Sequence, residues 1–174
     1  MKIKIFITIF LFIFLFYNLG HAQEEAKLYS QAVKAAKSGN FIFAFMYFRS
    51  LLANYPDSKY REGALFAQGE YYFLIADYND AGSTFIKFIN NYLGSKARIF
   101  ALAYLFKIAE NKKNSSLAKK IKNEIITFQR LSFLFSNYKE FKYRSLFLKK
   151  YRALYYIDKV EFYAGGELFA QIPY

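Results

Sequence analysis

An internal repeat with a period of 37 residues constrains this chain more than any single residue does. Segments 28–58 and 65–95 carry matching residue types at matching positions. Small residues recur where two helices must approach closely, and aromatic residues recur where the space between helices must be filled. Repetition at this length is typical of an array of helix pairs, and such arrays present extended binding surfaces. The matched positions are Leu28 and Leu65, Ala32 and Gly69, Gly39-Asn40-Phe41 and Ala76-Asp77-Tyr78, Ala44 and Ala81, Phe48 and Phe85, Leu51 and Phe88, Tyr55 and Tyr92, and Ser58 and Ser95.

Helical periodicity between turn signals predicts the elements of this array. The glycine of Ser38-Gly39-Asn40 ends the first helix, Pro56 ends the second, and Asp77 caps the fourth. We therefore expect a mainly α fold with about three antiparallel helix pairs, in which the last pair is a degenerate or capping repeat. The array is predicted to span residues 23–136, with helices over 24–37, 41–54, 59–75, 78–91, 96–110 and 116–135.

The last segment, residues 137–174, has a different character and is predicted to be a C-terminal cap with a short β-hairpin. Apolar and polar residues alternate over 159–172, and Gly165-Gly166 supplies a two-residue turn, which needs positive φ. Residues 137–157 suit either a helix or the start of another strand. Because a lone hairpin is only marginally stable in water, this one is expected to lie on the helices and seal the last repeat, to gain a third strand, or to pair its edge with a partner strand.

The N-terminal segment, residues 1–22, has the order of regions found in a secretory signal peptide. Lys2 and Lys4 precede an apolar run over 5–17, and Gly20-His21-Ala22 has small residues at the two positions that define a cleavage site. The alternative is an uncleaved anchor, although the apolar run is shorter than the about 20 residues that span a bilayer. The sequence contains no cysteine, so we expect an exported protein that is not a lipoprotein.

Charge is distributed unevenly along the chain, whose formal net charge is +12. Residues 98–174 carry fifteen Lys and Arg against six Asp and Glu, whereas residues 23–97 carry eight against seven. Such asymmetry indicates either a surface that faces a polyanion or a solvated lysine-rich face. Export argues against a nucleic-acid partner, which leaves an anionic membrane surface or an acidic protein face.

Catalytic chemistry is poorly represented in the sequence. The one histidine, His21, lies in the predicted signal peptide, and there are no cysteines. This composition leaves no Ser-His-Asp or Cys-His nucleophile and no zinc site of the usual kind. Asp77 and Asp80 are explained as helix capping, and no glycine-rich phosphate loop is present. We therefore expect no enzyme, no metal and no cofactor.

The repeat resembles tetratricopeptide repeats (TPR). Residues 25–97 are similar to the periplasmic TPR proteins of Gram-negative envelopes, which include the BamD-type outer-membrane assembly factor and the Tol–Pal-associated coordinator of cell division. The chain departs from the first in lacking a lipidated cysteine and having fewer repeats, and from the second in lacking an N-terminal coiled coil. The strings that carry the resemblance are Tyr55-Pro56-Asp57-Ser58-Lys59-Tyr60, Ala76-Asp77-Tyr78-Asn79-Asp80-Ala81 and Phe85-Ile86-Lys87-Phe88-Ile89-Asn90-Asn91-Tyr92.

The resemblance implies a mode of action. In TPR arrays the first helix of each pair lines a concave groove that holds the partner, and large aromatic side chains suit a binding hot spot. Each of these aromatics also suits a helical core, so both interpretations stay open. The matching positions are Tyr29, Val33, Phe66, Glu70, Phe73, Phe100 and Tyr104, with Lys107 one turn beyond Tyr104.

Together these features predict a non-enzymatic, exported adaptor or scaffold that binds an envelope protein, in the periplasm or at the outer membrane, where outer-membrane assembly is one such role. The alternative is a basic structural protein whose residues 98–174 lie on an anionic membrane surface, with the N-terminal segment retained as an anchor. The identity of the partner and the oligomeric state stay open.

Overall fold

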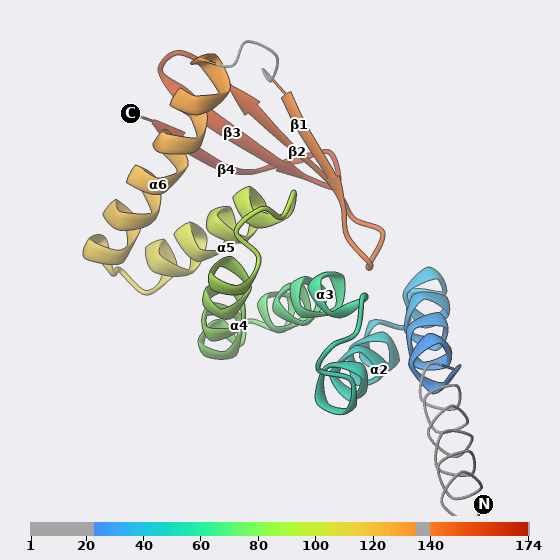
Figure 1. The fold of residues 1–174 in the computed structure, drawn as a ribbon. Coiled ribbons are helices and arrows are strands. Elements are labelled where there is room, and N and C mark those ends of the chain that lie inside the picture. Colours follow the sequence, from blue (N-terminus) through green and yellow to red (C-terminus); the bar gives the residue numbers. More distant parts are fainter. Residues whose placement is uncertain (1–22, 135–139, 174) are drawn as a thin grey trace, which may run out of the picture. The chain divides into compact units, whose positions relative to one another are not determined.

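A computed structural model of the chain describes residues 23–134 and 140–173, and the predicted signal peptide lies outside these ranges. The chain divides into two units, residues 1–61 and residues 62–174. Its described part is mainly helical and ends in an antiparallel sheet (Figure 1). No helix in that part combines the length and the apolar character needed to cross a bilayer.

The described part of the first unit is a helix pair. A helix over residues 23–37 is followed by α2 (Phe41–Asn54), and Asn40 caps α2 by accepting from the Phe43 amide at 3.3 Å. Both helices bury small or aromatic residues of the repeat, as the sequence predicts. The buried apolar residues of this unit are Ala32, Ala36, Ala44, Phe48, Leu51 and Tyr55.

Four helices open the second unit: α3 (Arg61–Leu74), α4 (Tyr78–Asn91), α5 (Arg98–Asn111) and α6 (Ser115–Leu134). The first residue of α3 lies at the boundary between the units. Helix α4 packs against α5, and α5 packs against α6. Gly69 permits the approach of α3 to α4, because a Cβ at this position would lie 2.8 Å from the Phe85 ring.

The turn between the two helices of each pair repeats with the same period of 37 residues. Gly39, Ala76 and Lys113 all adopt a positive φ, at 75°, 60° and 53°. The residue that follows each of them accepts a hydrogen bond from the amide three positions later, which is the geometry of an N-cap. The third helix pair therefore repeats the turn of the first two, although its residues match the repeat only faintly.

Contacts between side chains repeat as well. The Ser58 hydroxyl donates to Glu25 at 2.7 Å, and the Ser95 hydroxyl donates to Glu62 at 2.6 Å. Arginines that are also 37 residues apart donate to helix C-terminal carbonyls, Arg61 to Leu52 and Arg98 to Ile89. The internal repeat is thus a repeat of contacts and not only of residue types.

Residues 140–173 form a four-stranded antiparallel sheet in the order β1-β2-β3-β4. The strands are β1 (Glu140–Arg144), β2 (Lys150–Tyr155), β3 (Lys159–Ala164) and β4 (Glu167–Pro173). The predicted hairpin over 159–172 is confirmed as β3 and β4, and Gly165 and Gly166 both have positive φ in its turn. In Figure 1 the sheet lies across α5 with α6 beside it.

The hairpin prediction was nevertheless incomplete. It is one half of a larger sheet, because residues 140–144 and 150–155 are strands and not the helix that we considered for 137–157. The buried residues of β2 alternate, which is the period of a strand with one face on the core. The described part of the chain is therefore mainly helical with a C-terminal four-stranded antiparallel sheet, of which the predicted hairpin is the second half.

Candidate functional site

The sheet covers most of the helix positions that the TPR resemblance implies for partner binding. Phe66, Phe100 and Tyr104 are at most 2% exposed. Their rings contact aromatic rings of the sheet: Phe66 lies 5.2 Å from Tyr143, and Tyr104 lies 4.7 Å from Phe169. These side chains therefore belong to the core of the second unit in this structure, and they do not line an open groove.

The remaining predicted positions have other surroundings. Phe73 is half-buried and its ring lies 5.8 Å from Phe169. Lys107 is half-buried and forms an ion pair with Glu110 at 3.2 Å. In the first unit, Val33 is half-buried, and Tyr29 stacks on the Tyr60 ring at 3.8 Å. The structure thus brings Phe66, Glu70, Phe73, Phe100 and Tyr104 together under the sheet, and leaves the other three elsewhere.

Glu70 is the one carboxyl at the centre of this interface between the helices and the sheet. It is 4% exposed, and its Oε1 accepts a hydrogen bond of 2.5 Å from the Tyr151 hydroxyl. The Tyr104 hydroxyl lies 2.6 Å from the Tyr151 hydroxyl, so one hydrogen-bonded chain joins α3, α5 and β2. The second oxygen of Glu70, Oε2, has no partner among the described residues.

The surroundings of Glu70 change how it titrates. Burial raises the pKa of Glu70 from its ordinary 4.5 to about 7, against smaller opposing effects from the Tyr151 hydrogen bond and the positive charge of Lys149. The Ser145 hydroxyl also favours the charged form of Glu70, although it makes no well-formed hydrogen bond to any described residue. Burial raises the pKa values of Tyr104 and Tyr151 as well, so both phenols stay protonated. The hydrogen-bonded groups of Glu70, Tyr151 and Tyr104 are thus all buried in the core.

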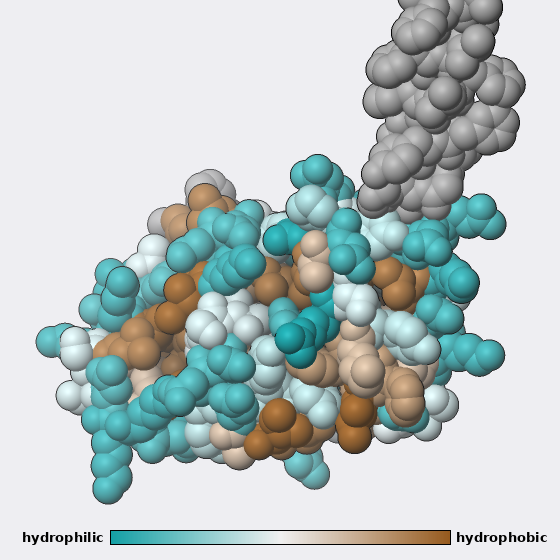
Figure 2. Space-filling view, turned by 90° about the horizontal axis from the view of Figure 1, so that it is seen from below, coloured by the Kyte–Doolittle hydropathy of each residue, from teal (hydrophilic) through white to brown (hydrophobic). Residues whose placement is uncertain are grey.

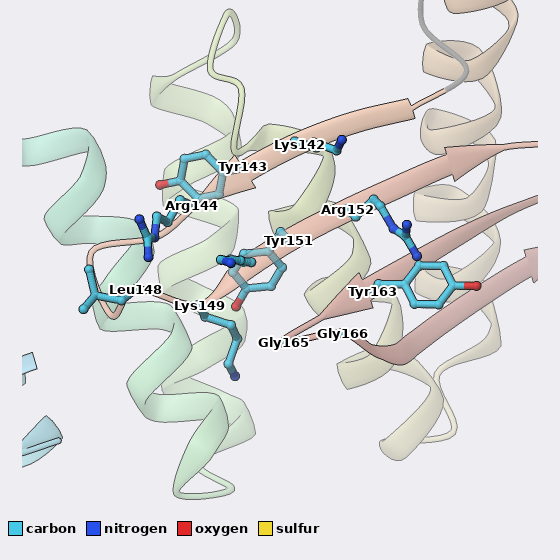
Figure 3. Close-up of a pocket in the computed structure, with 11 residues that line it drawn as sticks. Lys142, Tyr143, Arg144, Leu148, Lys149, Tyr151, Arg152, Tyr163, Gly165 and Gly166 are labelled. Carbon is cyan, nitrogen blue, oxygen red and sulfur yellow. The ribbon is translucent and has the colours of Figure 1, made fainter. Parts of the chain in front are cut away.

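A pocket of about 910 Å³ lies at the end of the sheet beside this network (Figure 3). Five of its lining residues are basic, three are tyrosines, and Tyr151 is shared with the Glu70 chain. We call it the basic pocket. Its lining residues are Lys142, Tyr143, Arg144, Leu148, Lys149, Lys150, Tyr151, Arg152, Tyr163, Gly165 and Gly166.

The basic pocket comes from one short sequence used twice. Lys-Tyr-Arg occurs at 142–144 in β1 and again at 150–152 in β2, and the antiparallel register places the two copies opposite each other. Tyr143 therefore pairs with Tyr151 on the side that faces the helices. On the other side, Lys142 lies opposite Arg152 and Arg144 lies opposite Lys150. Two adjacent cross-strand pairs of like charge result, an arrangement that destabilises a sheet.

Partners of these cations are few among the described residues. Glu140 pairs with Lys142 at 3.0 Å and with Arg152 at 3.8 Å, and the Arg152 guanidinium lies over the Tyr163 ring at 4.7 Å. Figure 3 shows this stacking of Arg152 on Tyr163. Arg144 and Lys150 form no ion pair within the described ranges. The pocket is not among the sites predicted from the sequence, although the Lys-Tyr-Arg segment that occurs twice was a readable signal for it.

A second exposed feature lies on the helix pair of the first unit. Ile42, Phe43 and Met46 of α2 are between 51% and 60% exposed, and Phe41 beside them is 38% exposed. We call these four residues the α2 patch. In the space-filling view of Figure 2, hydrophobic groups lie among hydrophilic ones on the face shown.

The α2 patch differs from the matching positions of the later pairs. Positions 42, 43 and 46 correspond to Asn79, Asp80 and Ser83 in α4, which are polar. In α6 they correspond to Ser116, Leu117 and Lys120. Because α4 forms the same capped helix with polar residues at these positions, the fold does not require apolar residues there.

Comparison of the sequence with protein-family models finds no match, and comparison with curated proteins finds none either. Among the described residues, no group of three or more His, Cys, Asp or Glu is placed to hold a metal ion. The functional assignment therefore depends on the geometry described above.

Proposed function

We propose that this chain is a non-enzymatic adaptor of the cell envelope, exported by its N-terminal segment, that binds a protein partner through a TPR-type array of helix pairs. The repeated turns and the repeated Ser–Glu contacts support the TPR-type interpretation. The groove-facing positions in α3 and α5 are occupied by the chain's own sheet, so the partner binds elsewhere on the array.

The observation that carries this proposal is the α2 patch. Ile42, Phe43 and Met46 are more than half exposed, whereas the matching residues of α4 are Asn79, Asp80 and Ser83. Exposed apolar residues that are grouped on one helix are typical of protein interaction sites. Large side chains in such a cluster provide most of the binding free energy when a partner buries them.

The test exchanges the patch for the residues that the chain itself uses in α4. The variant Ile42→Asn, Phe43→Asp, Met46→Ser places in α2 the residues that α4 has at the matching positions of its own helix. We expect the full chain to retain a stoichiometric protein partner from its own cells at about 0.5 M NaCl, where surface charges are screened beyond about 4 Å. The variant is expected to lose that partner.

A matched control makes the same kind of exchange away from the patch. Leu74 and Ile75 are also exposed apolar residues, and the first pair has Lys37 and Ser38 at the matching positions. The control Leu74→Lys, Ile75→Ser is expected to retain the partner. Equal loss in both variants, or retention in both, rules out the α2 patch as the binding surface.

The basic sheet favours a second candidate function, association with an anionic surface. Lys142, Arg144, Lys150 and Arg152 alternate along β1 and β2, and all four are exposed. Each basic residue near an anionic membrane contributes about 1 kcal/mol, and salt screens this attraction. The test measures binding of the full chain to an anionic membrane surface. Binding that is lost at about 0.5 M NaCl, and that the α2 variant does not change, supports this candidate over the adaptor.

A further inference from the structure

The cations of the basic pocket have no sufficient explanation in the stability of the sheet. Lysines on an edge strand discourage aggregation, and this accounts for the charge of β1, which is an edge strand. It does not account for Lys150 and Arg152, because β2 is paired on both sides. Like charges directly opposite each other cost free energy. Glu140 offsets this cost for Lys142 and Arg152, whereas the pair Arg144–Lys150 has no acidic partner among the described residues and calls for a ligand of opposite charge.

The size of the pocket and the character of its walls restrict that ligand. A volume of about 910 Å³ is at the upper end of the range for small-molecule sites, and it is much larger than one inorganic anion needs. Tyr163, which pairs with Arg152 and lies on the same side of the sheet as the cations, supplies ring surface for an uncharged part. The space beside Gly165 and Gly166 is open, since a Cβ at either position would meet nothing within 4 Å.

The donors in the pocket also restrict the charged part of the ligand. Arginine offers a planar fork that matches phosphate oxygens in pairs, and lysine adds point charges. Glu140 partly neutralises Lys142 and Arg152, which leaves Arg144, Lys149 and Lys150 for the ligand. Of these, Lys149 also acts through its positive charge on the Glu70 carboxyl. Such a concentration of positive charge suits a multiply charged anion better than a single carboxylate.

We propose that the basic pocket binds a phosphate-bearing ligand, in which one or more phosphate groups are attached to a larger body. The phosphate contacts Arg144 and Lys150, and the attached body lies against the Tyr163 ring. The source of the phosphate is either a soluble phosphorylated compound or the headgroup of an anionic lipid. This site goes beyond the adaptor function and does not depend on the α2 patch.

The test titrates the full chain with pyrophosphate by calorimetry, and separately measures its binding to vesicles of phosphatidylcholine with phosphatidic acid. The variant Arg144→Ala, Lys150→Ala is expected to weaken binding at least about tenfold, since a hydrogen bond to a charged group typically contributes that much. The control variant Lys119→Ala, Lys120→Ala removes the same formal charge from exposed positions of α6 and is expected to bind as the unmodified chain does.

The two arms identify the source of the phosphate. Saturable pyrophosphate binding that depends on Arg144 and Lys150 indicates a soluble ligand, and vesicle binding with the same dependence but no pyrophosphate binding indicates a lipid headgroup. The proposal is overturned by binding in neither arm, by equal losses in the two variants, or by equal affinity for citrate. The α2 variant is expected to bind the phosphate probes as the unmodified chain does. Failure of the adaptor proposal can therefore be distinguished from failure of the phosphate-site proposal.

Discussion

The helix pair of residues 23–54 and the pair formed by α3 and α4 contain the same repeated contacts, but they differ in the residues at their surfaces. Both have a positive-φ turn, an N-cap and a Ser–Glu hydrogen bond at positions 37 residues apart. Tyr29 and Val33 in the first pair correspond to Phe66 and Glu70 in the second. The repeated contacts are common to both helix pairs. The residues that differ distinguish their surfaces: α3 packs against the sheet, whereas α2 has an exposed apolar patch.

The largest expected contrast is between Phe66 and Tyr29. Phe66 is fully buried against α4, α5 and the sheet, so Phe66→Ala is expected to lower the free energy of unfolding by about 3–5 kcal/mol. Tyr29 is half-buried, and Tyr29→Ala is expected to cost about 1 kcal/mol. Urea unfolding of the two variants measures both. Equal costs would contradict the burial of Phe66 in the core of the second unit.

The next contrast is the pH dependence of stability. Glu70 in the second pair can titrate, whereas the matching residue of the first pair is Val33. The folded state holds the Glu70 proton up to pH about 7, whereas the unfolded chain releases it near pH 4.5. The folded state therefore binds more protons between these values, and the free energy of unfolding falls as pH rises through that window. The full effect is on the order of 3 kcal/mol.

Two variants isolate this carboxyl. Glu70→Gln is expected to remove most of the fall in stability between pH 4.5 and 7, measured by urea unfolding at several pH values. Glu167→Gln changes an exposed carboxyl at the start of β4 and is expected to leave the pH profile as it was. A profile that keeps its slope in Glu70→Gln would show that another group governs the pH dependence.

The smallest contrast concerns the three turns. Gly39, Ala76 and Lys113 share a positive φ, which only glycine adopts without steric cost. Gly39→Ala is expected to lower stability by about 1 kcal/mol, while Ala76→Gly and Lys113→Gly each raise it by about 0.5 kcal/mol.

The matched control for these turns is Gly94→Ala. Gly94 has no positive φ, and a Cβ added to it would meet no atom within 4 Å, so this exchange is expected to be neutral or slightly stabilising. Thermal unfolding of the four variants compares them directly. A destabilising Ala76→Gly would show that the turns of the two pairs are not equivalent in energy.

Much of the helical array was predictable because its signals are local. Gly39, Pro56 and Asp77 mark helix ends through backbone chemistry that does not depend on distant residues, and α2 begins and ends where the sequence predicts. The strands β1 and β2 were not predicted, since over residues 137–157 the aromatic and basic residues fit both a helical and an alternating pattern. Pairing with β3 decides between these patterns, and pairing is a contact between distant positions.

The sequence by itself determined the repeat, the helix boundaries to within about two residues, the β3–β4 hairpin and the uneven charge, because each depends on residue type and spacing alone. Only the tertiary structure decided that Phe66, Glu70, Phe100 and Tyr104 lie beneath the sheet, and that two Lys-Tyr-Arg segments meet to form the basic pocket. Both outcomes depend on which strand pairs with which and on what the sheet covers. A groove-lining aromatic residue and a core aromatic residue have the same sequence pattern, and burial by a distant segment separates them.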